Sequence, residues 1–522
     1  MLLIHPPVAK PGEPPAGLAR LAFALRSRGV ACKLWDASLE GLRDLLSQPV
    51  DVRPCGGGEK AGGSIDTWTH RAAAHVRENL AALSRLETFK TPDRYKQAVL
   101  ELNRVISAAG KQRGVHITLA NYTDPRLSPV KSGDLLQAAE QFEENPFYPF
   151  FSSRLPALMD ELGSFPGPRI VGFSVNFMSQ ALCAFAMAGF IRHAWPETRI
   201  VMGGGLVSSW ACIPGFDNPF FPLVDELAAG PGDARLLSMA GVAGPSAEKG
   251  VGMDFSYFDL DRYLSPRPVI AYPASRGCYW RKCAFCPEKY EKSPCQLFDK
   301  EAAAADVAGH VRKTGAGLVH FVDNALSPAF LKTLMRRPPG AAWYGFVRAT
   351  PHLTDPAFVE GLRQSGCVML KLGIESGDQA VLDAMNKGVR IETVSRALET
   401  IRAAGISVYA YLLFGTPAET LERARKTLSF TLAHADCIDF LNLAIFNLPA
   451  LSEDARGLET RRFYPGDLSL YREFVHPRGW HRPEVRRFLE KEFRQPASIR
   501  AKLAQDPPFF TSNHAPFFSH LY

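Results

Sequence analysis

The sequence predicts an α/β protein with two sheets, a helical insertion in the first and a small C-terminal extension. Two observations lead to this prediction. Short apolar strands alternate with amphipathic helices at the start of the chain and again from residue 269 to about 446, which is the pattern of parallel sheets. Between residues 37 and 165 the alternation stops, and helix formers dominate. With 522 residues, the chain is long enough for two or three domains.

Composition argues against two classes of partner. The net charge of +7 is small for this length, and no basic run is interleaved with aromatic residues, so we expect no nucleic-acid partner. No apolar stretch is long enough to cross a bilayer, so we expect no membrane partner. The ten cysteines occur without a recognisable signal peptide at Met1–Pro7. Reduced thiols and a cytoplasmic location are therefore expected.

Residues 1–250 are predicted to form a doubly wound, Rossmann-like domain. Residues 1–36 alternate as strand, helix and strand, which is a βαβ opening. The rhythm resumes after residue 165 with three further strands and a helix at about Ser179–Ala194. The predicted strands are Met1–Ile4, Ala31–Trp35, Ile170–Val175, Arg199–Met202 and Leu223–Leu227.

The insertion at residues 37–165 is predicted to be mainly helical. Its loops are expected at residues 56–58, where three glycines follow one another, and at Tyr122–Ser128. Nothing in its composition indicates chemistry, so packing and interface formation are the expected roles.

Residues 251–447 are predicted to form a partial (β/α)6 barrel, because six strands are separated by helices such as Asp355–Gln364 and Thr393–Ala403. Functional groups of such a barrel lie at the C-terminal ends of its strands. The predicted strands are Val269–Tyr272, Leu318–Val322, Trp343–Val347, Val368–Gly373, Ser407–Phe414 and Phe440–Phe446.

Three cysteines follow the first of these strands on a loop. Four residues separate Cys278 from Cys283, and two separate Cys283 from Cys286. Three thiolates suit a soft metal site, whereas a structural zinc normally takes four ligands. Cys295 would be available as the fourth ligand of a zinc site, which would make the chain a non-catalytic adaptor. The spacing alone leaves both alternatives open.

With Phe285 directly before its last cysteine, this loop resembles that of the radical S-adenosylmethionine (SAM) enzymes. The resemblance implies that Cys278, Cys283 and Cys286 hold a [4Fe–4S] cluster. The commonest family spacing has three residues between the first two cysteines. This chain has four, so its loop must accommodate one extra residue.

The resemblance continues along the barrel. Residues 373–377 read Gly-Ile-Glu-Ser-Gly and are similar to the family's SAM-binding signature. Further family positions follow the other strands. The residues implied to hold SAM are Phe285, Asp323, Asn324, Arg348, Glu375, Ser376, Gly415 and Pro417.

The first domain resembles the cobalamin-binding domain that many radical SAM enzymes carry before the barrel. The matching segments include residues 3–7, 171–174 and 202–205. The Asp-x-His-x-x-Gly motif of the cobalamin mutases is absent, and the only histidine near the corresponding loop, Pro6–Gly17, is His5. Either cobalamin binds without a histidine ligand, or the domain keeps only the fold. The residues implied to contact cobalamin are Pro7, Ser174, Asn176, Gly203, Gly204 and Gly205.

The resemblance implies a radical SAM enzyme that forms a 5′-deoxyadenosyl radical and methylates an unactivated carbon with the help of cobalamin. Its partners would be a small-molecule or peptide substrate and a reductant such as flavodoxin or ferredoxin. The alternative is a cyclase, epimerase or oxidase that does not methylate and acts on a peptide or small metabolite. Its cobalamin domain would be degenerate or serve as a scaffold. The sequence singles out no catalytic residue.

The C-terminal extension, residues 448–522, departs from the barrel rhythm. Its aromatic loops at Pro507–Phe510 and Pro516–Phe518 are expected to cap the barrel. They would either close its mouth over a substrate or serve as packing elements.

Overall fold

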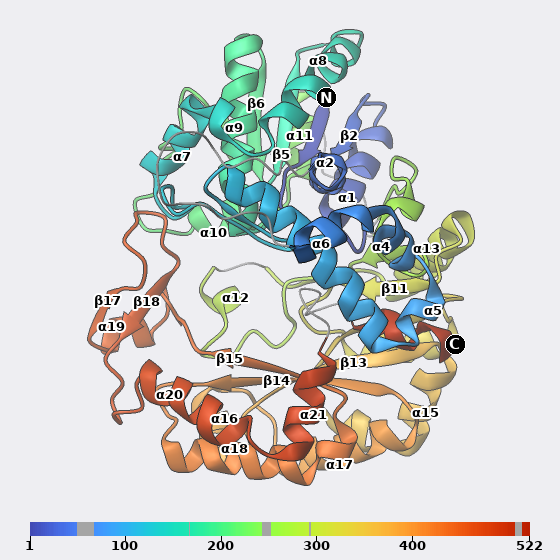
Figure 1. Cartoon of the computed structure of the whole chain (residues 1–522). Helices are drawn as coiled ribbons and strands as arrows, with labels where there is room; N and C mark the ends of the chain where they lie inside the picture. Colours follow the sequence, from blue (N-terminus) through green and yellow to red (C-terminus); the bar gives the residue numbers. More distant parts are fainter. Residues whose placement is uncertain (50–66, 166, 243–251, 292–293, 507–513, 522) are drawn as a thin grey trace.

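The computed structural model describes residues 1–521 except 50–66, 166, 243–251, 292–293 and 507–513. Two parallel sheets face each other across the molecule (Figure 1). The first sheet and its helices fill the upper half of the view. The second sheet, with helices along its outer side, fills the lower half, and α12 (Pro287–Tyr290) lies between them.

The first sheet has five parallel strands in the order β2-β1-β5-β6-β7. Every residue of β1 and β5 is buried, because helices cover both faces of the sheet. The five predicted strands are present with shifted ends. The last one starts three residues late, since the side-chain amide of Asn218 donates to the carbonyl of Val224 and holds that stretch in a turn. The bounds are Leu2–His5 (β1), Lys33–Asp36 (β2), Ile170–Ser174 (β5), Arg199–Gly203 (β6) and Glu226–Ala228 (β7).

Helices pack on both faces of this sheet. On one face, α1 contacts α11, and Leu3 packs into their apolar layer with Leu18 and Leu236. On the other face, α2 contacts β1, and α9 is buried on almost every side beneath α7 and α8. This strand order reverses direction between β1 and β5, which is where doubly wound sheets bind ligands. The helix bounds are Ala16–Arg26 (α1), Ala37–Ser47 (α2), Met178–Ala194 (α9), Gly205–Trp210 (α10) and Asp233–Met239 (α11).

The predicted insertion is mainly helical in its described part. One correction concerns the loop expected at Tyr122–Ser128, because its first two residues form β4 and pair with β3. The glycine loop at residues 56–58 lies outside the described residues. The bounds are Thr67–Ala74 (α3), Val76–Ala82 (α4), Leu86–Phe89 (α5), Pro92–Gln112 (α6), His116–Ile117 (β3), Tyr122–Thr123 (β4), Ser132–Glu140 (α7), Phe142–Glu144 (η1) and Tyr148–Gly163 (α8).

The second sheet has six parallel strands in chain order, β8-β11-β12-β13-β14-β15. β8 and β15 lie at opposite ends of that order, so the barrel is partial, as predicted. All six predicted strands are present, although β13 runs two residues past Gly373 with a register shift before Glu375. The bounds are Val269–Tyr272 (β8), Leu318–Phe321 (β11), Ala342–Val347 (β12), Cys367–Glu375 (β13), Ser407–Phe414 (β14) and Phe440–Ile445 (β15).

Helices line the outer side of the second sheet (Figure 1). Several begin at a side-chain cap, for example Asp299 on the amide of Ala302 and Ser327 on that of Phe330. The bounds are Lys300–Thr314 (α13), Pro328–Arg336 (α14), Pro356–Gln364 (α15), Gln379–Ala384 (α16), Ile391–Ala403 (α17) and Leu421–Ala433 (α18), with short 3-10 turns at Leu260–Arg262 (η2), Pro351–Thr354 (η3) and Ala435–Cys437 (η4).

The C-terminal extension forms a small sheet, β16-β18-β17, and several short helices. The helix α20 packs against the end of β14, where Phe414 contacts Phe488. The bounds are Leu448–Pro449 (β16), Asp454–Gly457 (α19), Thr460–Arg462 (β17), Tyr471–Phe474 (β18), Arg482–Phe488 (α20), Leu489–Phe493 (η5, a π-helical turn), Ala497–Gln505 (α21) and Ala515–Leu521 (η6).

The last turn, η6, packs on the inner face of the barrel. The ring of Phe518 lies 5.8 Å from that of Phe440, and the ring of His514 lies 4.5 Å from that of Tyr409. Both barrel residues belong to the first half of their strands, so this tail closes the end opposite the cysteine loop. The aromatic loop at 507–510 lies outside the described residues. Among the described helices, none has the length and apolarity needed to cross a membrane.

Candidate functional site

The cysteine loop is an irregular segment between two anchored ends. It starts after β9 (Ser275–Arg276), which pairs with β10 (Gln296–Leu297), and it ends at α12, directly after Cys286. Two of its residues have a left-handed backbone, Gly277 (φ 68°) and Arg281 (φ 50°). An irregular backbone of this kind lets side chains of nearby residues turn to one side.

The three thiols lie on one loop, but their side chains are not arranged around a common point as metal ligands are. Across the described residues, no group of three or more His, Cys, Asp or Glu side chains is arranged to hold a metal ion. The pKa of Cys286 is raised to about 11, mainly by burial and in part by the nearby thiols of Cys283 and Cys278. All three are free cysteines. Three free, adjacent thiols on one loop fit a [4Fe–4S] cluster with three protein ligands.

Cys283 lies among cations, namely Arg348 directly after β12 and Lys387 shortly after α16. It is buried, and Nη1 of Arg348 donates to its Sγ at 3.8 Å. Burial raises the pKa of this thiol, while Lys387 and Arg348 oppose that shift. Trp280 packs over the guanidinium of Arg348 at 4.3 Å. Two cations beside a thiol favour its thiolate form and hence a metal cluster.

A buried ion pair adjoins this group. Nζ of Lys387 lies 2.6 Å from Oε1 of Glu375, and both side chains are about one-tenth exposed. Glu375 ends β13 with φ 65°, a conformation that a non-glycine residue rarely adopts. Lys387 also lies 5.5 Å from the centre of the Phe285 ring. The structure therefore brings Cys283, Phe285, Arg348 and Glu375 together at one end of the barrel.

Three other residues predicted to hold SAM differ in their burial and in their hydrogen bonds. Asp323 is buried and accepts hydrogen bonds from the amide of Ala274 and the hydroxyl of Ser275, which ties the loop after β8 to β11. Burial raises the pKa of Asp323 to about 6. Asn324 is exposed. Ser376 is fully buried and bonded to Thr427 on α18, so its hydroxyl is already engaged.

A pocket of about 510 Å³ adjoins Phe285. Its lining includes Phe285, Pro417 and Met385. Gly415 has φ 82° and donates its amide to Glu419, and it borders the next pocket along the barrel end. The assigned SAM roles of all eight residues stay predictions, while the pocket shows that Phe285 and Pro417 share one concave surface.

A second cavity, of about 580 Å³, lies between the two sheets. One wall is the C-terminal edge of the first sheet, and the other is the cysteine loop with the segment that follows it. The lining residues are Leu3, Gly17, Leu18, Arg20, Leu21, Gly172, Phe173, Ser174, Asn176, Val201, Gly203, Gly204, Gly205, Ser208, Ala228, Gly230, Pro231, Gly232, Asp233, Leu236, Arg276, Gly277, Glu288, Glu291, Pro294, Gln296 and Val322.

Five of the six residues predicted to contact cobalamin line this cavity: Ser174, Asn176, Gly203, Gly204 and Gly205. Among them, Asn176 donates to the hydroxyl of Ser174 at 3.1 Å and accepts from the amide of Gly205 at 3.0 Å. This bridges the ends of β5 and β6.

Pro7 is not among the described lining residues, and no histidine is either. His5 is buried beside Gln180, and burial lowers its pKa. Whether Pro7 contacts a ligand stays a prediction.

Sequence reasoning missed a charged group in the same cavity. Asp233 bonds both Arg20, at 3.0 Å, and Arg276, at 3.3 Å. Nε and Nη1 of Arg20 are buried without a hydrogen-bond partner among the described residues. The sequence did show the Gly-Pro-Gly-Asp turn at 230–233, but a turn alone does not reveal that two arginines from distant segments meet there.

Comparisons with known proteins agree with this geometry. Residues 272–431 match the model of the Radical SAM superfamily. The anaerobic magnesium-protoporphyrin IX monomethyl ester cyclase of Rubrivivax gelatinosus is 26% identical over 172 residues, which are 32% of this chain and 31% of that protein. The tRNA-2-methylthio-N(6)-dimethylallyladenosine synthase of Chlorobium phaeobacteroides (strain BS1) is 26% identical over 246 residues, or 43% of this chain and 55% of that protein. The chain thus spans about a third to about half of these relatives.

The whole fold has a solved counterpart. The radical S-adenosylmethionine methyltransferase TsrM from Kitasatospora setae, with tryptophan substrate and a SAM analogue bound, matches with a TM-score of 0.53 and 15% identity. The match covers 96% of this chain and 88% of that one. TsrM has also been solved with cobalamin and a [4Fe–4S] cluster bound, and that structure matches with a TM-score of 0.49.

Proposed function

Residues 272–431 place this chain in the radical SAM superfamily, and from that premise we propose that it is a cobalamin-dependent enzyme that methylates an unactivated carbon. The [4Fe–4S] cluster and SAM come with the family. Cobalamin and methylation are the parts that this proposal adds, together with a small-molecule substrate and an external reductant of the flavodoxin or ferredoxin type.

The observation on which the proposal rests is the position of the 580 Å³ cavity. It lies where a doubly wound sheet binds ligands, and its opposite wall contains Gly277 and Arg276 of the cysteine loop. A cofactor held there would face the cluster end of the barrel. The glycines at the end of β6 leave room for a large ring system, because they have no side chains.

The cluster end has the groups that such an enzyme needs. When bound, the cluster supplies the electron that cleaves SAM to the 5′-deoxyadenosyl radical. Cys278, Cys283 and Cys286 would hold the cluster. Glu375 would accept hydrogen bonds from SAM, and the pocket beside Phe285 and Pro417 would enclose its apolar surface and exclude water.

The cavity supports cobalamin binding without a histidine ligand. The side-chain amide of Gln180 contacts the ring of buried His5 and donates to the carbonyl of Pro6. His5 is absent from the described lining of the cavity. The chain shares its fold with TsrM, which has been solved with cobalamin bound, and this supports cobalamin as the ligand. The relative named a cyclase favours the alternative, a radical SAM reaction without methyl transfer.

Product analysis tests the proposal. Anaerobically reconstituted protein should contain about four irons per chain and convert SAM to 5′-deoxyadenosine. With cobalamin added, it should also form S-adenosylhomocysteine, which is the SAM product of methyl transfer. Formation of 5′-deoxyadenosine alone would favour the non-methylating alternative.

Two cysteine variants separate the cluster from a zinc site. Cys283→Ala should abolish SAM cleavage because it removes a cluster ligand, whereas Cys295→Ala should retain it. Full activity of Cys283→Ala, or zinc in place of iron with equal dependence on Cys295, would overturn the cluster assignment.

A further inference from the structure

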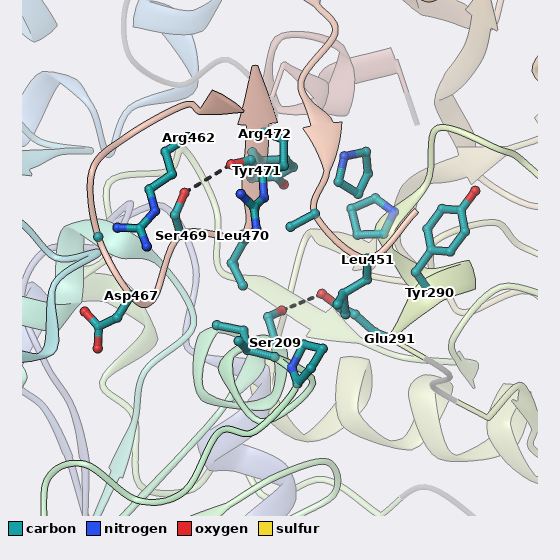
Figure 2. A pocket seen from close by; sticks show the side chains of 16 residues that line it. Ser209, Tyr290, Glu291, Leu451, Arg462, Asp467, Ser469, Leu470, Tyr471 and Arg472 are labelled. Carbon is teal, nitrogen blue, oxygen red and sulfur yellow. Dashed lines mark hydrogen bonds between the residues drawn. The ribbon is translucent and has the colours of Figure 1, made fainter. Parts of the chain in front are cut away.

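A further pocket lies between α12 and the C-terminal extension (Figure 2). It has a volume of about 250 Å³. Its walls come from four separate parts of the chain: α10 of the first domain with the turn after it, α12 after the last cysteine, residues 449–451 at the end of β16, and the hairpin of β17 and β18. None of the predicted site residues lines it.

This pocket is connected to the proposed reaction centre through three residues. Pro287, the residue after Cys286, is part of its lining. Tyr471 lies near enough to Glu291 and Cys286 that both, after burial itself, raise the pKa of its phenol. Glu291 lines both this pocket and the 580 Å³ cavity. A molecule in the pocket would therefore be next to both cofactor sites.

Two arginines stand opposite each other on the hairpin. Arg462 on β17 and Arg472 on β18 are direct partners in the antiparallel register, and both line the pocket. Side chains of directly opposite residues lie on the same face of a sheet, with Cβ atoms about 4.5–5.5 Å apart. Two like charges in such a pair repel and destabilise the hairpin, unless an anion lies between them.

Among the described residues neither arginine forms a close ion pair or a hydrogen bond through its side chain, although Arg462 lies near enough to Asp467, which also lines the pocket, to help lower the pKa of that carboxyl. The hydrogen bonds of the two lining acids go to other residues: Glu291 accepts from the hydroxyl of Ser209 at 2.7 Å, and Asp467 accepts from the amide of Ser132 at 2.9 Å. Arg472 has no charged partner among the described residues, and Arg462 has only the longer-range attraction of Asp467. The next register pair shows the contrast, because Arg461 is bonded to Glu473 at 2.8 Å.

The rest of the lining is largely apolar. Ile213, Pro214, Pro449, Leu451 and Leu470 contribute to it. The volume of about 250 Å³ is below the roughly 300–1,000 Å³ of drug-sized ligand sites, which favours a small metabolite over an extended peptide. Paired guanidinium groups recognise carboxylates and phosphates through charge-assisted hydrogen bonds.

We propose that this pocket is the substrate subsite, and that Arg462 and Arg472 hold the carboxylate or phosphate of a small substrate whose apolar body lies toward α12. This inference rests on the proposed function for the identity of the bound molecule as substrate. The anion site itself rests only on the arginine pair and the pocket.

Calorimetric titration of the reconstituted full-length protein tests it. The probes are phenylacetate, phenyl phosphate and the neutral phenylacetamide. At least one acid should bind about tenfold or more tightly than the amide, because only the acid can form charge-assisted hydrogen bonds with the two guanidinium groups. Which acid binds more tightly then assigns the substrate as a carboxylate or a phosphate.

Variants locate the binding. Arg462→Gln and Arg472→Gln should each weaken binding of the acid about tenfold or more and remove the preference over the amide. Arg461→Gln is the matched control, since its partner is Glu473, and it should bind as the unaltered protein does. Phenyl phosphate should raise the melting temperature of the unaltered protein, and this increase should disappear in Arg472→Gln.

Three results would overturn the proposal: no preference for either acid, equal acid binding in Arg472→Gln, or equal loss in Arg461→Gln. Formation of 5′-deoxyadenosine from SAM, assayed on the same samples, keeps the two proposals apart. Acid binding without SAM cleavage would contradict the proposed function alone. SAM cleavage without acid binding would contradict the subsite alone.

Discussion

At the scale of single residues, the side chains around Cys283 determine the charge at this end of the barrel. Arg348 donates to the sulfur, and the Lys387–Glu375 pair lies beside it. A buried ion pair contributes little net stability, but removing one partner leaves an uncompensated charge and is costly. The backbone of Glu375 has φ 65°. A non-glycine residue in this conformation is strained, and strain of this kind is often found at binding sites.

Substitution of Glu375 separates SAM binding from cluster assembly. Glu375→Gln should weaken SAM binding about tenfold or more, because a charge-assisted acceptor is lost, while the iron content stays the same. Equilibrium dialysis with SAM and an iron assay measure the two effects.

The double variant Glu375→Gln with Lys387→Met removes both charges and so controls for the cost of an unpaired lysine. It should fold as stably as the single variant or more so, and it should still bind SAM weakly. Unchanged SAM affinity in the single variant would show that Glu375 only holds Lys387.

Lys371, inside the barrel, gives a pH prediction. Its Nζ lies 3.3 Å from His320 and 4.9 Å from the Tyr344 ring. Burial lowers its pKa from 10.5 to about 7, with Glu13 opposing this. Between these pH values the unfolded chain holds a proton that the folded protein has released, so stability rises with pH over this range.

Lys371→Met should remove that rise. The unaltered protein should gain up to about 1.4 kcal/mol of unfolding free energy per pH unit from this residue between pH 7 and 10, and the variant should lack this contribution. Denaturation midpoints across the range measure the difference. If the unfolding free energies of the unaltered protein and of Lys371→Met change with pH in the same way, Lys371 does not lose its proton on folding.

At the scale of elements, the turn after β6 depends on a single glycine. Gly204 has φ 105° and ψ 178°, a region open almost only to glycine. A Cβ there would lie 2.5 Å from the carbonyl oxygen of Val175, whereas one on Gly205 would meet nothing nearer than 3.8 Å.

Gly204→Ala should therefore lower the unfolding free energy by about 1–3 kcal/mol, and Gly205→Ala should leave it nearly unchanged. Urea unfolding of the two variants tests this. Equal unfolding free energies of Gly204→Ala and Gly205→Ala would mean that the turn after β6 accepts a side chain at residue 204 without strain. The turn would then not fix the wall of the cavity.

The strands could be predicted from the sequence because buried parallel strands are short, continuous apolar runs. The ends were less accurate. β13 continues to Glu375 because pairing with β14 resumes after a register shift, which no local pattern reveals.

The candidate site was predictable only where a family motif names it. Cys283, Phe285 and Glu375 were found from such motifs. The facing of Arg462 and Arg472, and the meeting of Arg20 with Arg276 at Asp233, depend on register and domain packing, which the sequence does not display.

At the scale of the whole molecule, residues from both sheets line one cavity. The loop after β1 also enters the barrel, where Glu13 accepts from His320 at 2.7 Å. The C-terminal extension closes the barrel from two sides, with η6 at the end opposite the cysteine loop and the β17–β18 hairpin beside α12. Under the proposed function, the cavity between the sheets is where a cofactor of the first domain would meet the cluster of the second.

The central claim, cobalamin bound in that cavity without a histidine ligand, is tested most directly by electron paramagnetic resonance of the Co(II) form after anaerobic reconstitution and removal of unbound cobalamin. We expect about one cobalt spin per chain with no splitting from a protein nitrogen, and the same spectrum in His5→Ala. Absence of a bound cobalt signal, or a signal split by a protein nitrogen, would contradict the account.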